Sequence, residues 1–221
     1  MDISLILLTL QIAVVATAIN LPIAIGLSWL IVKRRVRGSF LLDVLVSLPL
    51  ALPPVVSGYF LLLLLGREGP VGSLIRDILG VDIVFTWVAA ALASAVVSFP
   101  LMARGVMTAI EGVDERLERS ARSLGAGALR VAFTITLPLA YRGIMAGVLL
   151  GFVRALSEFG ATIVVAGNIP GRTQTLPLAI FEKVQLGRDA DALRLVGVSI
   201  ALAVATILVH NWLLSKSRTK N

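Results

Sequence analysis

The sequence contains no cysteine and only one histidine in 221 residues. Disulfide bonds and thiolate metal sites are therefore excluded, and no clustered carboxylates offer a metal site or a nucleophile with its base. The phosphate-cradling pattern G-x-x-x-x-G-K-[ST] is also missing, so the chain cannot bind ATP phosphates by that route. These absences argue against an enzyme, and we expect the chain to bind no metal or cofactor of its own.

Charge is scarce as well. Only 15% of the residues are charged, 57% are hydrophobic, and the mean hydropathy is +0.95. Several charge-free runs reach the roughly 20 residues that cross a bilayer, which predicts an all-α polytopic membrane protein in the cell membrane. The basic residues lie at the ends of these runs, so the high pI indicates topology signals and not a nucleic-acid partner.

Five apolar runs could span the membrane: 3–32, 43–67, 82–104, 143–166 and 194–216. A further apolar piece, 131–141, is too short to span, and we expect it at the interface or against other helices. The segment 167–194 is too polar to span and is expected to form an external loop. The whole chain, 1–221, is therefore predicted to be one transmembrane domain.

The basic residues predict the orientation. Thirteen Lys and Arg residues fall in 33–37, 104–142 and 216–220, against six in 66–82 and 167–194. Because cytoplasmic loops carry the excess of positive charge, the N-terminus is expected outside and the C-terminus inside. The polar segment within 104–142 then faces the cytoplasm.

That polar segment has the pattern of a bent pair of short helices. Leu117, Ala121 and Leu124 recur at helical spacing, and Glu118 stands four residues before a basic partner, Arg122, in the favourable order. An ordinary amphipathic cytoplasmic loop would show the same features.

Two glycines, Gly125 and Gly127, interrupt the first helix, and a glycine there can adopt the positive φ of a helix end. A second short apolar stretch follows and ends at Pro138. The pattern therefore predicts a helix, a glycine bend and another helix, presented to the cytoplasm.

The spacing of Gly125, nine residues, Ile135, one residue and then Leu137-Pro138 resembles the cytoplasmic signature of ABC-importer permeases, E-A-A-x3-G-x9-I-x-L-P. Arg119 and Ser120 depart from that pattern. In the family this loop, here about 111–138, is the coupling element seated in a cleft of the ATPase subunit. The resemblance implies a coupling role for Glu118, Ala121, Leu124, Gly125, Ile135, Leu137 and Pro138.

Three further blocks, 47–66, 98–114 and 156–181, resemble the molybdate branch of these permeases. The resemblance implies the type I ABC importer transmembrane fold over about 5–214, and import of a tetrahedral oxyanion, most closely molybdate. It also implies three partners: two ATPase subunits that use the ATP, a second permease copy in a homodimer, and an external oxyanion-binding protein. Sulfate or tungstate import is the alternative. A secondary transporter or channel is less favoured because neither internal repeats nor charges on several spans are found.

Prolines at 49, 53 and 54 fall inside the second run and should break or kink it. Freed carbonyls at membrane depth are tolerated only where they are buried in protein or line a cavity. One interpretation therefore puts Pro53, Pro54 and Ser57 near the translocation path, and the other is a kinked helix packed in the bundle.

The fourth run carries small residues at fourfold spacing, Gly143, Gly147 and Gly151, which predict close packing within one subunit or across a dimer axis. It also holds Arg154 and Glu158, the only charges well inside an apolar run. Because an unpaired charge at mid-bilayer costs about 2.5–3.5 kcal/mol, we expect the two to pair. The pair is either a structural lock or part of a gate.

Overall fold

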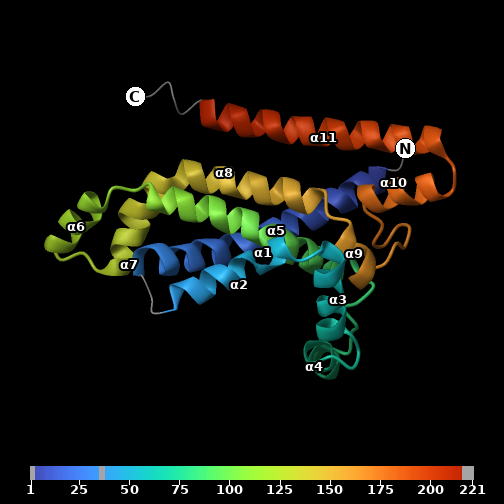
Figure 1. The fold of residues 1–221 in the computed structure, drawn as a ribbon, viewed down its shortest axis with the longest axis horizontal. Coiled ribbons are helices and arrows are strands. Elements are labelled where there is room, and N and C mark those ends of the chain that lie inside the picture. Colours follow the sequence, from blue (N-terminus) through green and yellow to red (C-terminus); the bar gives the residue numbers. More distant parts are fainter. Residues whose placement is uncertain (1–2, 35–37, 216–221) are drawn as a thin grey trace.

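The computed structural model describes residues 3–34 and 38–215, and all secondary structure in these ranges is helical (Figure 1). The elements are α1 (Ile3–Arg34), α2 (Ser39–Ala51), α3 (Pro54–Leu65), α4 (Pro70–Leu79), α5 (Trp87–Glu111), α6 (Glu115–Ser123), α7 (Ala128–Val131), a π-helical turn η1 (Ala132–Thr136), α8 (Leu137–Leu156), α9 (Gly160–Val165), α10 (Leu176–Gln185) and α11 (Asp189–Ser215). The predicted all-α class is confirmed.

Four helical segments are long and apolar enough to cross a membrane, and a bent pair of helices makes a fifth candidate. The predicted number of spans is therefore right. The crossing helices α1, α5, α8 and α11 run along the long axis of the molecule, with α6 at one end and α9 and α10 at the other (Figure 1). The basic residues 35–37 and 216–220, on which the predicted orientation partly depends, lie outside the described residues.

Helix α5 forms the centre of the bundle, packed between α1 and α8. Its buried face is rich in alanine and also holds Met102, Val106 and Ile110. Two buried polar side chains, Asn20 of α1 and Ser98 of α5, add directional contacts, because Asn20 donates to the Ala95 carbonyl oxygen at 2.9 Å and to the Ser98 Oγ at 3.1 Å. Small residues and interhelical hydrogen bonds are what hold helices together in lipid, where apolar burial alone gives little driving force.

The glycine stripe of α8 lies against α5. A Cβ added at Gly143 would come within 2.5 Å of the Ala109 Cβ, and one at Gly151 within 2.8 Å of the Met102 Cε. At the centre of the contact the backbones meet, since a Cβ on Gly105 would lie 2.6 Å from the Gly147 Cα. The sequence left open whether this stripe packs within one subunit or across a dimer axis, and the contact with α5 lies within one chain.

The second apolar run is broken, as its prolines predict. Helix α2 ends at Ala51, α3 begins at Pro54, and their axes meet at 110°. Leu52 and Pro53 between them have extended ψ angles of 141° and 136°. Pro49 stays inside α2, so it does not break the helix. Figure 1 shows α3 and α4 leaving the bundle sideways from this bend.

The prediction for the fourth run is wrong in its boundaries. The membrane helix does not begin at 143, because residues 128–156 form one continuous span that includes the apolar piece 131–141. Pro138 was expected to end a short helix, but the π turn before it accommodates the proline: the Leu137 N–H donates to the Ala132 carbonyl, five residues back. A wider turn relieves the clash that a proline ring makes with the preceding turn, so the helix continues.

The same run also ends earlier than predicted. Helix α8 stops at Leu156, and residues 157–159 separate it from the short α9, which ends at Val165. The external segment 167–194 consists of a loop, α10 and the first turn of α11.

Candidate functional site

The elbow, residues 114–127, which the sequence predicts to face the cytoplasm, is a short capped helix followed by a glycine turn. The Asp114 side chain accepts a hydrogen bond from the Arg116 N–H at 2.8 Å, which caps the N-terminus of α6. Gly125 has φ +87°, a left-handed conformation that glycine adopts without steric cost, and it turns the chain toward α7. The predicted helix and glycine bend are confirmed, although Gly127 has an ordinary φ of −66°. The second helix is not short, because it continues into α8.

The apolar stripe of the elbow faces outward. Leu124 is 90% exposed and Leu117 is 49% exposed, while Ala121 is partly buried. Of the remaining residues assigned to coupling, Ile135 and Leu137 are partly buried and lie in the first turns of the long span. Pro138 is exposed there. An exposed apolar stripe at the end of a bundle is typical of a protein interaction site.

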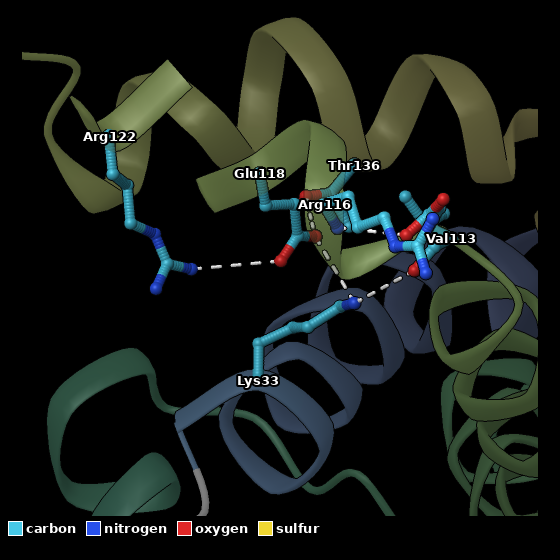
Figure 2. Close-up of polar contacts among 7 residues, drawn as sticks. Lys33, Val113, Arg116, Glu118, Arg122 and Thr136 are labelled. Atoms are coloured by element: carbon cyan, nitrogen blue, oxygen red, sulfur yellow. Dashed lines mark hydrogen bonds and ion pairs between the residues drawn. The ribbon is translucent and has the colours of Figure 1, made fainter. Parts of the chain in front are cut away.

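Glu118 points the other way, into the protein, and is 3% exposed (Figure 2). Its Oε1 lies 3.2 Å from the Lys33 Nζ and accepts a hydrogen bond from the Thr136 Oγ1 at 2.7 Å. Its Oε2 lies 3.6 Å from the Arg122 guanidinium, so the predicted Glu118–Arg122 ion pair is present, at a longer distance than the contact with Lys33. The Lys33 Nζ also donates to the Val113 carbonyl oxygen at 3.4 Å. One carboxylate thus joins α6 to the end of α1 and to the π turn that leads into α8, and Lys33 extends the link to Val113 in the segment after α5.

Sequence reasoning missed Lys33 and Thr136 as partners of Glu118. Lys33 opens the basic cluster that we interpreted only as a topology signal, and Thr136 lies in a run judged apolar. No local pattern indicates either partner, because Lys33 and Thr136 belong to other helical elements.

The second group of predicted residues lies at the break after α8. The Arg154 Nη1 is 2.8 Å from the Glu158 Oε2, so the expected pair forms. Glu158 is not inside a helix, as its place in the apolar run suggested, but lies in the break, where its Oε1 accepts from the Ala161 N–H at 2.8 Å. The carboxylate therefore both neutralises Arg154 and satisfies the first turn of α9.

Helix α9, which follows this break, packs against α3. A Cβ added at Gly160 would lie 3.0 Å from the Pro54 Cβ, and one at Gly58 would lie 2.7 Å from the Ala161 Cα and carbonyl oxygen. Ser57 is buried beside this contact, whereas Pro53 is exposed. The structure thus packs the helix that follows the break, α9, against α3 near Pro54 and Ser57, while Arg154 lines a cavity with Thr206 and Ile207 of α11.

The end of the molecule that carries α10 holds a hydrogen-bond network around Glu182 of that helix. Its Oε2 accepts hydrogen bonds from the Asn168 and Gln174 side-chain amides at 3.1 and 2.5 Å. Burial tends to raise the pKa of Glu182, but the hydrogen bonds and the neighbouring Lys183 charge outweigh burial, so this pKa lies below 4.5. The network ties two residues of loop 167–175 to α10.

Next to that loop is an open cavity of about 860 Å³, lined at its rim by Arg67, Glu68, Asp82 and Arg172. Arg67 is paired with Asp82 at 2.9 Å. Among the described residues no group of three His, Cys, Asp or Glu side chains could hold a metal ion.

The chain was compared with known families and proteins. The family described as "Binding-protein-dependent transport system inner membrane component" matches residues 5–213. The molybdenum transport system permease protein ModB of Escherichia coli is 48% identical over 97% of this chain and 94% of its own length. ModB of Haemophilus influenzae is 43% identical over 100% and 96%. The sulfate transport system permease protein CysW of Synechococcus elongatus is 36% identical over 92% and 72%.

Two solved structures have the same fold. A bacterial ABC transporter involved in alginate import superposes with a TM-score of 0.72 at 17% identity, covering 99% of this chain and 79% of the other. The MetNI methionine ABC transporter gives 0.69 at 15% identity, covering 95% and 94%. The type I importer transmembrane fold is therefore confirmed.

Proposed function

The chain belongs to the family of binding-protein-dependent transport system inner membrane components, and on that premise we propose that it is the membrane-spanning subunit of an ATP-driven molybdate importer. The observation that carries the proposal is the near full-length identity of 48% and 43% to molybdenum permeases. The identity to a sulfate permease is lower, 36% over 92% of the chain. Tungstate remains the alternative substrate, because it shares the tetrahedral dianionic form of molybdate.

The elbow is the part of this chain on which the ATPase subunits act. Two copies of this chain form a two-fold dimer, and each copy presents the exposed Leu117 and Leu124 to one of two ATPase subunits. The ATPase subunits bind and hydrolyse the ATP, and this chain holds no nucleotide. In support of this division of roles, the sequence has no phosphate-cradling loop.

The α3–α9 contact and the α8–α9 break border the translocation path. Pro53, Pro54 and Ser57 supply the bend of α3, and Glu158 neutralises Arg154 there. Neutralisation matters for a dianion, because conduction requires a site weak enough to release the ion. A bare arginine at this depth would retain molybdate.

An external binding protein delivers the oxyanion to the end of the molecule that carries α10. The loop 167–175, held by the Glu182 network, offers that protein a preformed surface. Preformed surfaces bind with a smaller entropic cost than flexible ones.

Uptake by the reconstituted complex tests the proposal. Proteoliposomes contain the permease, its ATPase subunits and the loaded binding protein, and uptake of labelled molybdate, tungstate and sulfate is compared. We expect ATP-dependent uptake of molybdate and weak uptake of sulfate. The purified permease alone should hydrolyse no ATP. Uptake without ATP, or hydrolysis by the permease alone, would contradict the proposal.

A further inference from the structure

The buried contact of helix α6 with the rest of the chain is made by a charged side chain. Glu118 is the only buried residue of the nine in this helix. Short surface helices normally derive their stability from an apolar face packed on a core, whereas Leu117 is 49% exposed and lines an open cavity with Leu139 and Ala140 of α8. The position of α6 therefore depends on what the Glu118 carboxylate binds.

The Glu118 carboxylate binds groups from helices that cross the membrane. Lys33 belongs to the last turns of α1, and Thr136 ends the π turn that leads into α8 (Figure 2). The Glu118 and Lys33 side chains are only 4% and 7% exposed, so water screens their attraction little. Charged hydrogen bonds of this kind are roughly twice as strong as neutral ones. Helix α6 cannot shift without moving α1 and the start of α8 or breaking this contact.

The same geometry removes the carboxylate from the outer face of the elbow. Arg119 is exposed and occupies the position at which the permease signature has its acid. A protein that docks on the elbow meets Arg119 and the leucines, while Glu118 lies behind them. The acid of this chain is thus placed to act on its own helices.

We propose that Lys33, Glu118 and Thr136 form an internal link that transmits displacement of α6 to α1 and α8. The inference rests on the proposed function, since it assumes that an ATPase subunit moves α6. All three are positioning residues. Glu118 fixes α6 to the membrane helices, and it makes no contact with the ATPase.

The test separates docking from transmission with a matched set of variants. Glu118→Gln and Lys33→Met each remove one charge, and the double variant removes both, which leaves no buried unpaired ion. Replacing a buried ion pair with uncharged groups of similar volume is often neutral for stability, so the double variant should fold. Thr136→Val removes only one hydrogen bond. Asp191→Asn, in an exposed pair with Arg194, is the control.

Three quantities are measured in the reconstituted complex: the amount of ATPase subunit retained on the tagged permease, the rate of ATP hydrolysis, and molybdate uptake per ATP hydrolysed. We expect the double variant to retain the ATPase and to hydrolyse ATP while uptake per ATP falls. Coupling energies between sites correspond to about 5- to 150-fold, and we expect a fall in this range. Thr136→Val should give a smaller fall, and Asp191→Asn none.

Two results would overturn the proposal. Loss of ATPase retention in proportion to uptake would put Glu118 in the docking interface. Unchanged uptake per ATP, or failure of the double variant to assemble, would make the pair purely structural. Failure of the proposed function is a separate result, because the unaltered complex would then import no molybdate.

Discussion

Two buried glutamates, Glu118 and Glu158, are both paired with cations and hydrogen-bond donors, but the partners come from different parts of the chain. They are 3% and 2% exposed, and each has an arginine four residues away, at 3.6 and 2.8 Å. The partners of Glu158, namely Arg154 and the Ala161 N–H, lie within four residues of it. The closest partners of Glu118, Lys33 and Thr136, come from distant parts of the chain.

This difference indicates what each carboxylate can do. Arg154 and Ala161 belong to α8 and α9, which only residues 157–159 separate, so their relative movement is limited and Glu158 suits a fixed break. Glu118 joins α6 to Lys33 and Thr136, which lie far from it in the chain, so this contact changes whenever those elements shift and Glu118 suits a moving part. Four substitutions, or changes of condition, test the comparison, and they are ordered by expected effect.

Glu158→Gln should have the largest effect on stability. Breaking a buried ion pair by removing one partner costs about 3–5 kcal/mol, because the other charge stays buried and unpaired. The cost should fall on Arg154, which is only 26% exposed. Glu118→Gln should cost less, because Lys33, although only 7% exposed, keeps its hydrogen bond to the Val113 carbonyl oxygen. The measurement is thermal unfolding and yield of monodisperse permease in detergent.

The double variant Arg154→Met with Glu158→Gln is the control, and it should recover most of the yield. Equal yields for Glu158→Gln and the unaltered protein would show that the pair does not hold the break. The contrast between the two glutamates would then be wrong.

Two glycines, one in the α3–α9 contact and one in the elbow, should respond differently to asparagine. Gly58→Asn should destabilise the protein by about 1–3 kcal/mol, the usual cost of overpacking, since its Cβ would meet the Ala161 backbone at 2.7 Å. Gly125→Asn should cost far less, because the space there is open and asparagine tolerates positive φ. Gly125→Val is the matched variant, because valine does not tolerate a positive φ. Chemical denaturation in detergent would rank the three, and a Gly125→Asn loss as large as that of Gly58→Asn would contradict the assignment.

The sequence predicts some of these sites and not others. The difference is the separation along the chain between the residues that form each one. The glycine bend at Gly125, the proline break before α3 and the Arg154–Glu158 pair follow from neighbours within a few residues, and all three are present. The Lys33–Glu118 contact joins two helices whose relative placement is a property of the fold, so no local pattern predicts it.

The predicted boundary of the fourth span was wrong for a different reason. Pro138 normally ends or kinks a helix, and a π turn that accommodates it leaves no mark in the hydropathy pattern. The external network around Glu182 was missed because its amides come from a loop that sequence reasoning treated only as polar.

Arg122→Gln should have a small effect and so isolate the distant partners of Glu118. The Arg122 side chain is 51% exposed and lies 3.6 Å from the carboxylate. Exposed pairs contribute about 0–1 kcal/mol, so the free energy of unfolding should change by no more than that. Lys33→Met, measured in the same way, should lose more. A larger loss for Arg122→Gln than for Lys33→Met would make the local pair the main anchor of α6.

Acid should loosen the external loop 167–175 before it affects the rest of the molecule, with the smallest effect of the four. Glu182, unlike the two buried glutamates, is reached by water, and its pKa lies below 4.5. A lowered pKa means that the ionised form stabilises the folded loop; this contribution is complete above pH 4.5 and is lost as the pH falls through the lowered pKa. Hydrogen exchange of the loop amides, measured between pH 6 and pH 3 and corrected for intrinsic rates, should show protection falling at the acid end. In Glu182→Gln the protection should be lower at pH 6 and should not fall further, and an unchanged acid response in that variant would assign the loosening to another group.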